Sequence, residues 1–382
     1  MPSERLLLGP GPSPVSARVL RALAGPVVSH LDPDMVQALD DVRRQLDWIF
    51  GAASGSFSFA VSGTGTSGME TAVANVTRSG TRVLVVVTGY FGDRLAQMFE
   101  RYGAAVTRLD LEWGRACNPE DVERALAGSG TEIVGCVHAE TSTGVLNPVE
   151  AIAGVAARHG AMVVVDAVTS LGAVPVRTNA WGVDVCYSCS QKGLGAPPGL
   201  APVTFSARAL ERRVPSRSFY FDVGLLEDYW VRRRYHHTMS APLAFALREA
   251  LTTVEEEGLD ARYARHERHH LALLAGLESL GLSLLPPPGE RLWTLNAVRV
   301  PEGVDEALVR RRLLEEFQIE IGAGLGPLAG RIWRVGLMGA GSTLSNVLLF
   351  LSAFERCLRA AGYRPRSSNA AVAAEHLLTP NS

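Results

Sequence analysis

Short runs rich in β-branched residues alternate with amphipathic segments through the first half of this 382-residue chain. The strand-like runs lie at residues 82–87, 105–109, 132–137, 162–165, 183–189 and 200–205. Helical patterns separate several of them, at residues 91–102, 119–126 and 148–159. Strands that alternate with helices predict a mostly parallel sheet with helices on both faces. The expected fold class is therefore α/β.

The pattern changes after about residue 240, where longer helical stretches replace the short alternating runs. A chain of this length can bury one large core and one smaller core. We expect an N-terminal arm at residues 1–20, a large domain at 21–245, a smaller C-terminal α+β domain at 246–363, and a mobile tail at 364–382.

Charge and composition exclude several classes of partner. The formal net charge is −2, so the chain has no basic excess to neutralise a nucleic acid or an anionic membrane. No apolar run approaches the roughly 18 residues of a membrane span, and the N-terminus lacks the order of a signal peptide. The five cysteines are odd in number and lie mostly in apolar runs. We therefore expect reduced core thiols, no metal site and a cytoplasmic protein.

One lysine comes directly after a strand-like run. Lys192 follows residues 183–189 and opens a turn rich in glycine and proline. A lysine before glycine is often a solvated loop residue, but the end of a buried strand favours the neutral amine that forms Schiff bases. Asp166 closes the preceding run, at residues 162–165, in the same way. A lysine to carry pyridoxal phosphate and a carboxylate to pair with its ring nitrogen are what this cofactor requires, so we predict Lys192 and Asp166 as catalytic residues.

Two further side chains are expected at the same edge of the sheet. In open parallel sheets, ligands bind outside the carboxyl ends of the strands. Phe91 follows the run at residues 82–87, and Thr141 follows the run at 132–137. The pattern therefore predicts that Phe91 and Thr141 lie close to Asp166 and Lys192.

A phosphate-binding turn is predicted at residues 62–68, which read Ser-Gly-Thr-Gly-Thr-Ser-Gly. The segment follows a strand-like run at residues 59–61 and opens a helical pattern at 69–78. Glycines let the backbone approach an anion, hydroxyls donate to it, and a helix N-terminus adds unpaired N–H groups. The alternative is a plain helix cap without a ligand.

Seven blocks of sequence stand in an order that is specific to one family. They are Leu8-Gly-Pro-Gly-Pro12, Ser62-Gly-Thr-Gly65, Glu140-Thr-Ser-Thr-Gly-Val-Leu146, Val165-Asp-Ala-Val168, Ser190-Gln-Lys192 with Ala196-Pro-Pro-Gly199, Tyr235-His-His-Thr238, and Ile319-Glu-Ile321 through Gly324-Leu-Gly-Pro327 to Trp333-Arg-Val-Gly336. From about residue 6 to residue 363 the chain resembles the class V, fold type I, aminotransferases that use pyridoxal phosphate. Within them it is similar to the alanine–glyoxylate and serine–pyruvate branch.

The resemblance implies how the cofactor is held. Lys192 matches the Schiff-base lysine, and Asp166 matches the partner of the pyridine nitrogen. The other cofactor contacts that it implies are Thr64, Gly65 and Thr66 at the phosphate, Phe91 stacked on the ring, Thr141 near the phenolic oxygen, and Gln191.

The resemblance also implies a substrate site and a homodimer. Arg334 matches the arginine that holds the substrate α-carboxylate, while Gly11 and Thr141 border the substrate. Tyr235 and Thr238 match residues that reach the cofactor phosphate of the neighbouring subunit. The two active sites of such a dimer are shared between the subunits.

Three positions depart from the family pattern. Relatives often carry histidine at Thr66, tryptophan at Phe91, and proline at Trp293. We expect a softer grip on the phosphate and weaker stacking from the first two, and a surface or core position for Trp293.

The expected reaction is transamination between a small amino acid of the alanine or serine type and a 2-oxo acid of the glyoxylate or pyruvate type. It would run by a ping-pong mechanism through the Lys192 Schiff base. The alternative is an enzyme of the same fold with a larger substrate or another reaction, such as a lyase, a desulfurase or a pathway-specific aminotransferase. A non-catalytic relative is a third possibility.

Overall fold

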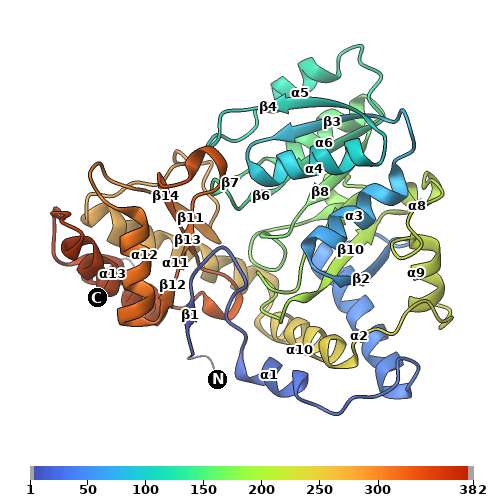
Figure 1. Cartoon of the computed structure of the whole chain (residues 1–382). Coiled ribbons are helices and arrows are strands. Elements are labelled where there is room, and N and C mark those ends of the chain that lie inside the picture. The colour runs from blue at the N-terminus through green and yellow to red at the C-terminus, as the bar shows by residue number, and fades with distance from the viewer. Residues whose placement is uncertain (1–3, 377–382) are drawn as a thin grey trace.

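A seven-stranded sheet forms the centre of the computed structural model, which describes residues 4–376 (Figure 1). In spatial order its strands are β2 (Phe57–Gly63), β10 (Gly199–Phe205), β9 (Val185–Tyr187), β8 (Met162–Asp166), β5 (Ile133–Val137), β3 (Arg82–Val87) and β4 (Ala105–Asp110). Neighbouring strands are parallel except where β10 runs antiparallel to β2 and β9. The expectation of a mostly parallel α/β sheet is confirmed.

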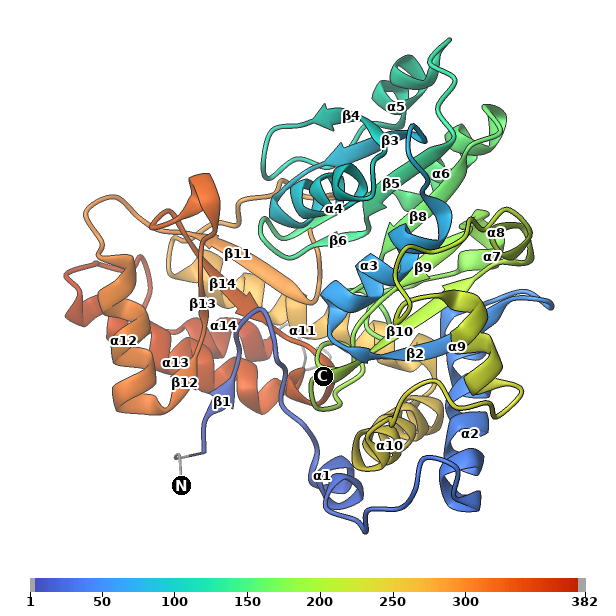
Figure 2. The same cartoon turned by 45° about the vertical axis from the view of Figure 1, so that its right-hand side comes forward.

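Helices cover both faces of this sheet (Figure 2). The helices α3 (Gly65–Val76) and α4 (Tyr90–Arg101) connect strands in the direction of β4, whereas α5 (Pro119–Leu126) and α6 (Val149–Arg158) lead back toward β8. Right-handed crossovers in opposite directions lie on opposite faces of a sheet. The contacts agree, since α3 packs against α4 and α5 packs against α6. Burial on both faces explains the uninterrupted apolar sequences of the central strands.

Two long helices pack against each other beside the β2–β10 edge. The helix α2 (Pro33–Phe50) starts with proline at its first turn and ends at Gly51, whose φ of 59° is left-handed. The buried residues of α10 (Ala241–Glu257) belong to the core of the large sheet as far as Val254. The expected domain boundary between residues 245 and 246 falls within this helix. Shorter helices of this part are α1 (Ala17–Leu23), α7 (Thr178–Trp181), α8 (Ala207–Glu211) and α9 (Val223–Trp230).

A second, smaller core is formed mainly by residues C-terminal to α10. Its elements are α11 (Leu259–Ser279), β11 (Leu295–Arg299), α12 (Glu306–Phe317), β12 (Ile319–Glu320), β13 (Gly322–Ala323), β14 (Ile332–Gly336) and α13 (Leu344–Ala360), with 3-10 turns at Gly326–Leu328 and Gly339–Gly341. The strands β11, β14 and β13 form an antiparallel sheet. The N-terminal β1 (Leu6–Leu7) pairs in parallel with β12, and Leu8 is buried in this core. Residues 6–8 of the N-terminal arm thus pack with the smaller core, whereas Val19 belongs to the core of the large sheet.

The C-terminal segment differs from the unpacked tail that was expected at residues 364–382. A helix, α14 (Ala370–His376), packs against α11 and α13, and its Ala370 and Ala374 are buried. A segment rich in alanine shows no clear amphipathic pattern in the sequence, so the helix was not predicted. The small alanine side chains allow it to pack closely against other helices. Residues 1–3 of the expected arm and residues 377–382 of the expected tail lie outside the described residues.

The structure shows the state of the cysteines, the character of the helices and the grouping of metal-binding side chains over residues 4–376. The five cysteines are unpaired and buried there. Within the same residues, no helix combines the length and the apolar character needed to cross a membrane. The described part of the chain also contains no group of three His, Cys, Asp or Glu side chains placed to hold a metal ion.

A short hairpin joins the two cores. It consists of β6 (Ala139–Glu140) and β7 (Val145–Leu146) and follows β5 at the carboxyl end of the large sheet. From the smaller core, Leu292 N donates to Gly144 O at 2.8 Å. The carboxyl ends of the central strands therefore face the boundary between the two cores.

Candidate active site

A cavity of about 190 Å³ lies at the carboxyl end of the large sheet. Eight of the residues predicted from the sequence line it: Thr64, Gly65, Thr66, Phe91, Thr141, Asp166, Gln191 and Lys192. The strands β5, β8 and β9 end at the same level of the sheet, because Asp166 is paired with Val137 on one side and with Tyr187 on the other. The residues that follow these strands are therefore close together. The structure thus brings together side chains from five separate segments of the chain.

Lys192 is buried at this cavity, in the turn that follows β9. Its Nζ donates to Thr169 Oγ1 at 3.1 Å and to Thr141 Oγ1 at 3.4 Å, and these two hydroxyls are 2.7 Å apart. In the described residues no carboxylate forms an ion pair with it. Burial lowers the pKa of Lys192 below the usual value for lysine. Burial therefore shifts the amine toward its neutral, nucleophilic form.

Asp166 is the last residue of β8 and is 3% exposed. Its Oδ1 accepts a hydrogen bond from Val168 N at 2.8 Å. Burial raises the pKa of Asp166 to about 6, although this hydrogen bond acts in the opposite direction. A buried carboxylate that lacks an ion-pair partner among residues 4–376 gains stability from any cation placed beside it.

The predicted phosphate turn forms the first turn of α3. The helix begins at Gly65 rather than at Met69, because glycine and small polar residues are well accepted at a helix start. Thr64 is the N-cap residue, but its side chain makes no capping hydrogen bond. Ser67 N and Gly68 N donate to Thr64 O at 2.8 and 3.2 Å, which leaves the N–H groups of Gly65 and Thr66 at the helix start to bind an anion. Gly65 permits a close approach, since a Cβ there would lie 3.0 Å from Val168 Cγ2.

Arg334 and Gly11 reach the site from the smaller core and the arm. Arg334 lies on β14, and its Nε donates to Ala323 O at 2.6 Å while its Nη1 lies 3.4 Å from Thr141 O. Burial lowers the pKa of Arg334 to about 10. Gly11 has a φ of 112°, and a Cβ there would lie 3.0 Å from Lys192 Cε. The site therefore contains residues from both cores.

Tyr235 and Thr238 are not among the residues that line the cavity. Both are exposed, whereas His237 between them is buried and lies 2.8 Å from Ser62 Oγ through its Nε2. The segment is therefore anchored beside the start of the phosphate turn, with Tyr235 and Thr238 turned toward solvent.

Glu140 fixes the start of α4, a role that was not predicted from the sequence. This fully buried carboxylate accepts hydrogen bonds from Phe91 N at 3.2 Å and Gly92 N at 3.1 Å, at the start of α4. It also accepts from Ser142 Oγ at 2.6 Å, and burial raises the pKa of Glu140. Gly89 is required here, because a Cβ would lie 2.6 Å from Glu140 Cδ. Glu140 belongs to one of the seven blocks, but nothing in the sequence showed that it holds the helix that carries Phe91.

Two other contacts were missed. Thr169, which binds the Lys192 amine, comes three residues after Asp166, and no pattern distinguished it from its neighbours. Arg94 lines the cavity and donates from Nη1 to Thr66 Oγ1 at 3.3 Å. Its position one helical turn after Phe91 was the only available signal.

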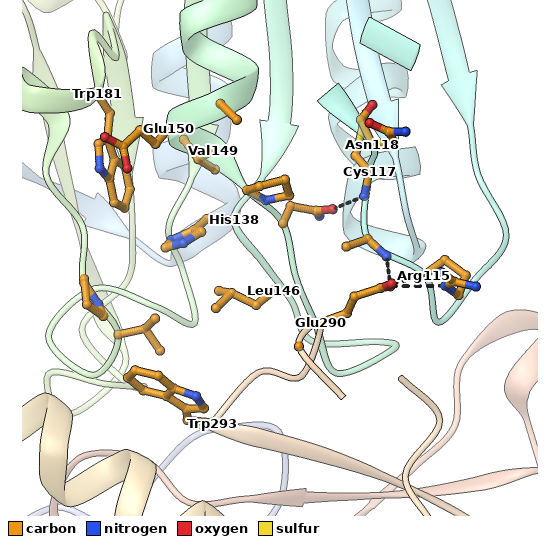
Figure 3. Close-up of a pocket in the computed structure, with 17 residues that line it drawn as sticks. Arg115, Cys117, Asn118, His138, Leu146, Val149, Glu150, Trp181, Glu290 and Trp293 are labelled. Carbon is orange, nitrogen blue, oxygen red and sulfur yellow. Dashed lines mark hydrogen bonds and ion pairs between the residues drawn. The ribbon is translucent and has the colours of Figure 1, made fainter. Parts of the chain in front are cut away.

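A larger cavity of about 770 Å³ is bordered by Leu146 of β7 (Figure 3). It is lined by residues that include His138, Leu146, Trp181 and Trp293, and none of the predicted site residues lines it. Trp293 therefore borders this second cavity and not the one that contains Lys192.

Comparisons with known proteins agree with this geometry. Residues 14–331 match the family described as aminotransferase class-V. The (S)-ureidoglycine–glyoxylate transaminase of Bacillus subtilis is 37% identical over 93% of this chain and 90% of its own. The crystal structure of ureidoglycine–glyoxylate aminotransferase from the same organism has a TM-score of 0.96 and 36% identity, and covers 99% of both chains. An alanine–glyoxylate aminotransferase from Nostoc sp. is 44% identical, with a TM-score of 0.92 over 94% of this chain and 96% of its own.

Proposed function

Because this chain belongs to the class-V aminotransferases, we propose that it transfers the amino group of a small amino acid to glyoxylate or a similar 2-oxo acid. The observation that carries the proposal is the convergence of Lys192, Asp166 and the first turn of α3 on one cavity. Glyoxylate is the favoured acceptor, because it appears in the names of relatives that differ in their amino donor.

The residues of the cavity fit pyridoxal phosphate, the cofactor of this family. A buried amine, a buried carboxylate, an aromatic face and an uncapped helix N-terminus are the groups that this molecule needs. Gln191 Oε1 supports the fit, since it is a buried acceptor that has no hydrogen-bond partner in the described residues. When bound, the cofactor supplies the electron sink that stabilises negative charge at the substrate Cα.

The chain would contribute the proton transfers and the orientation. Lys192 would move the proton from the substrate Cα to the C4′ carbon of the cofactor, and in the opposite direction when the 2-oxo acid is converted, because its lowered pKa makes the amine a better proton acceptor. Asp166 would keep the ring nitrogen protonated by pairing with it. Phe91 would hold one face of the ring, and its ring centroid already lies 5.6 Å from Lys192 Nζ.

Arg334 would bind the α-carboxylate of the substrate. Its guanidinium has only backbone carbonyl acceptors among the described residues, at Ala323 and Thr141, so its charge is available to an anion. A carboxylate bound there would lie beside Thr141, whose hydroxyl is within reach of Lys192. This arrangement orients the substrate Cα toward the lysine.

A desulfurase is not supported by the cysteines. All five are buried, and burial raises the pKa of Cys117 to about 12 and the pKa values of Cys189 and Cys357 to about 11. A desulfurase needs a reactive thiolate on an accessible loop. Transamination does not use a thiol and is therefore favoured over this alternative.

A second candidate concerns only the amino donor. The relative at 37% identity is named for (S)-ureidoglycine, so this compound stands beside alanine and serine as a donor. The test is to mix the purified protein and pyridoxal phosphate with each donor, and to follow the cofactor's absorbance and the 2-oxo acid released. We expect conversion with at least one small donor, and regeneration by glyoxylate. Failure of every donor with both glyoxylate and pyruvate would contradict the proposal.

We also propose a homodimer in which Tyr235 and Thr238 reach the partner's site. Supporting this, Tyr235 is 64% exposed, Phe219 is 72% exposed and Val27 is 81% exposed, which are unusual values for large apolar side chains. His30 packs edge-on against Tyr235, which links the N-terminal segment to the same surface. A stable interface of this kind buries more than about 2,000 Å². A cytoplasmic location remains a proposal, supported by the five unpaired cysteines in the described residues.

A further inference from the structure

Arg94 forms one wall of the cavity that contains Lys192. It lies one turn after Phe91 on α4, and its guanidinium carbon is 5.3 Å from the Phe91 ring centroid and 5.1 Å from that of Tyr90. From this position Nη1 donates to Thr66 Oγ1 at 3.3 Å, and Nη2 donates to the Tyr90 hydroxyl at 3.4 Å. The two aromatic faces hold the guanidinium against the phosphate turn.

The positive charge of Arg94 is not neutralised by a carboxylate within residues 4–376. The acidic residue beside it in the sequence, Asp93, and the acidic residue one turn after Thr66 on α3, Glu70, have other partners. Asp93 forms an ion pair with Arg108 at 2.8 Å, and Glu70 accepts a hydrogen bond from the Tyr102 hydroxyl at 3.0 Å. Arg94 therefore presents a cation whose described hydrogen-bond partners are neutral hydroxyls.

The phosphate turn itself has no positively charged side chain. Thr64, Gly65 and Thr66 offer hydroxyls and the N–H groups of the first turn of α3. At residue 66 the turn has a threonine, and the Thr66 hydroxyl accepts from Arg94. A guanidinium binds phosphate oxygens more strongly than a neutral donor does.

We propose that Arg94 is the cation that binds the cofactor phosphate in this chain. The inference rests on the proposed function, because it requires pyridoxal phosphate in this cavity. It adds a cofactor-binding residue on α4, outside the seven sequence blocks. It also explains how the turn can hold a dianion with threonine at residue 66.

The test compares two forms of the cofactor on the apoprotein. The dissociation constants of pyridoxal phosphate and of pyridoxal, which has no phosphate, are measured by absorbance for the wild type and for Arg94→Gln. We expect Arg94→Gln to weaken binding of pyridoxal phosphate by about 10- to 100-fold, the range for one hydrogen bond to a charged group. Binding of pyridoxal should change far less. Inorganic phosphate should compete with pyridoxal phosphate on the wild type and lose most of this effect on Arg94→Gln.

Two further variants sharpen the result. Arg101→Gln removes an exposed arginine from the same helix that does not bond to Thr66, and we expect both dissociation constants to stay at the wild-type values. Thr66→His in the Arg94→Gln background should restore part of the affinity for pyridoxal phosphate. If Arg94→Gln does not fold, Arg94→Lys takes its place, with a smaller loss expected for pyridoxal phosphate alone because the charge remains but the planar fork is lost.

The outcomes separate this inference from the proposed function. Equal loss of pyridoxal and pyridoxal phosphate in Arg94→Gln would mean that Arg94 only supports the Phe91 ring, and would overturn the phosphate assignment. Unchanged affinity for both compounds would also overturn it, while the proposed function would stand. A wild-type apoprotein that binds neither compound would overturn the proposed function and this inference with it.

Discussion

Lys192 Nζ lies 3.1 Å from Thr169 Oγ1, so a neutral hydroxyl holds the amine of a buried lysine. A hydroxyl can donate to a neutral amine or accept from a charged one. A carboxylate in the same place would favour the ammonium form and raise the pKa of the lysine. Thr169 therefore fixes the position of the nucleophile without favouring its protonation.

Lys192→Ala should abolish the covalent attachment of the cofactor. The 37 basic residues of the chain are 36 arginines and this one lysine, so borohydride reduction should label a single side chain. Mass spectrometry after reduction should find the adduct on Lys192 in the wild type and no side-chain adduct in the variant. Turnover should fall by roughly 100- to 10,000-fold, the usual contribution of an acid–base group. Full turnover in Lys192→Ala would show that the assignment is wrong.

Asp166→Asn should separate stability from catalysis. Burial raises the pKa of Asp166 from 3.8 to about 6, so the folded apoprotein binds an extra proton between these values. The stability contributed by the protonated form is complete below pH 3.8 and is lost as the pH rises through 6. At pH 8 the unfolding free energy of the variant apoprotein should therefore exceed that of the wild-type apoprotein by up to about 3 kcal/mol. The variant should unfold at a higher temperature for the same reason.

The difference in stability should shrink as the pH falls toward 4, and calorimetry of both apoproteins checks it. Turnover should change in the opposite direction, with a loss of roughly 100-fold or more, because an amide cannot keep the ring nitrogen protonated. Equal turnover in the two proteins would argue for another way of stabilising charge at Cα.

Glu140→Gln should loosen the start of α4 and with it the Phe91 ring. The amide would place an NH₂ group against N–H and O–H donors that now point at carboxylate oxygens. We expect pyridoxal phosphate and pyridoxal to lose affinity by a similar factor, since stacking involves the ring and not the phosphate. Phe91→Leu should have a similar effect, and the double variant should be little worse than either single one. Additive losses would contradict a role through Phe91.

Gly11→Ala should impair turnover by crowding the lysine. The new Cβ would lie 3.0 Å from Lys192 Cε, at a φ of 112°. Gly80→Ala is the matched control, because Gly80 also has a positive φ, 82°, but nothing lies within 4 Å of its Cβ position. Both variants should lose stability from the backbone strain, by about 1–2 kcal/mol, and only Gly11→Ala should lower kcat. Equal kcat in the two variants would show that Gly11 does not border the reacting groups.

Subunit mixing tests the shared active site. A Lys192→Ala chain and a Tyr235→Phe/Thr238→Val chain should each be inactive alone. Mixed and allowed to exchange, they should regain activity, because one of the two sites in each heterodimer then has its own Lys192 and an intact Tyr235 and Thr238 from the other chain. A fully active monomer in the ultracentrifuge at assay concentration would rule the dimer out.

The sequence by itself determined the elements and the most local parts of the candidate site. The alternation of apolar runs with amphipathic segments was enough for the parallel sheet, because each strand and helix is specified by residues within it. Lys192 and Asp166 could be placed at strand ends for the same reason, since each follows its own apolar run. The extent of β9 was overestimated, because the apolar run continues past Tyr187 into the turn.

The resemblance had assigned Arg334, Gly11 and Thr141 to the site, but only the tertiary structure decided which atoms of distant groups are in contact. Arg334 approaches Thr141 across 193 residues, Gly11 lies against Lys192, and Arg94 reaches Thr66. These contacts depend on how two separate cores and two helices pack, and such packing has no periodic signature in the residues involved. The same holds for α14, whose alanines become a buried surface only where α11 and α13 come together. The residues within each segment determined its secondary structure, and the packing of the segments determined which side chains are in contact.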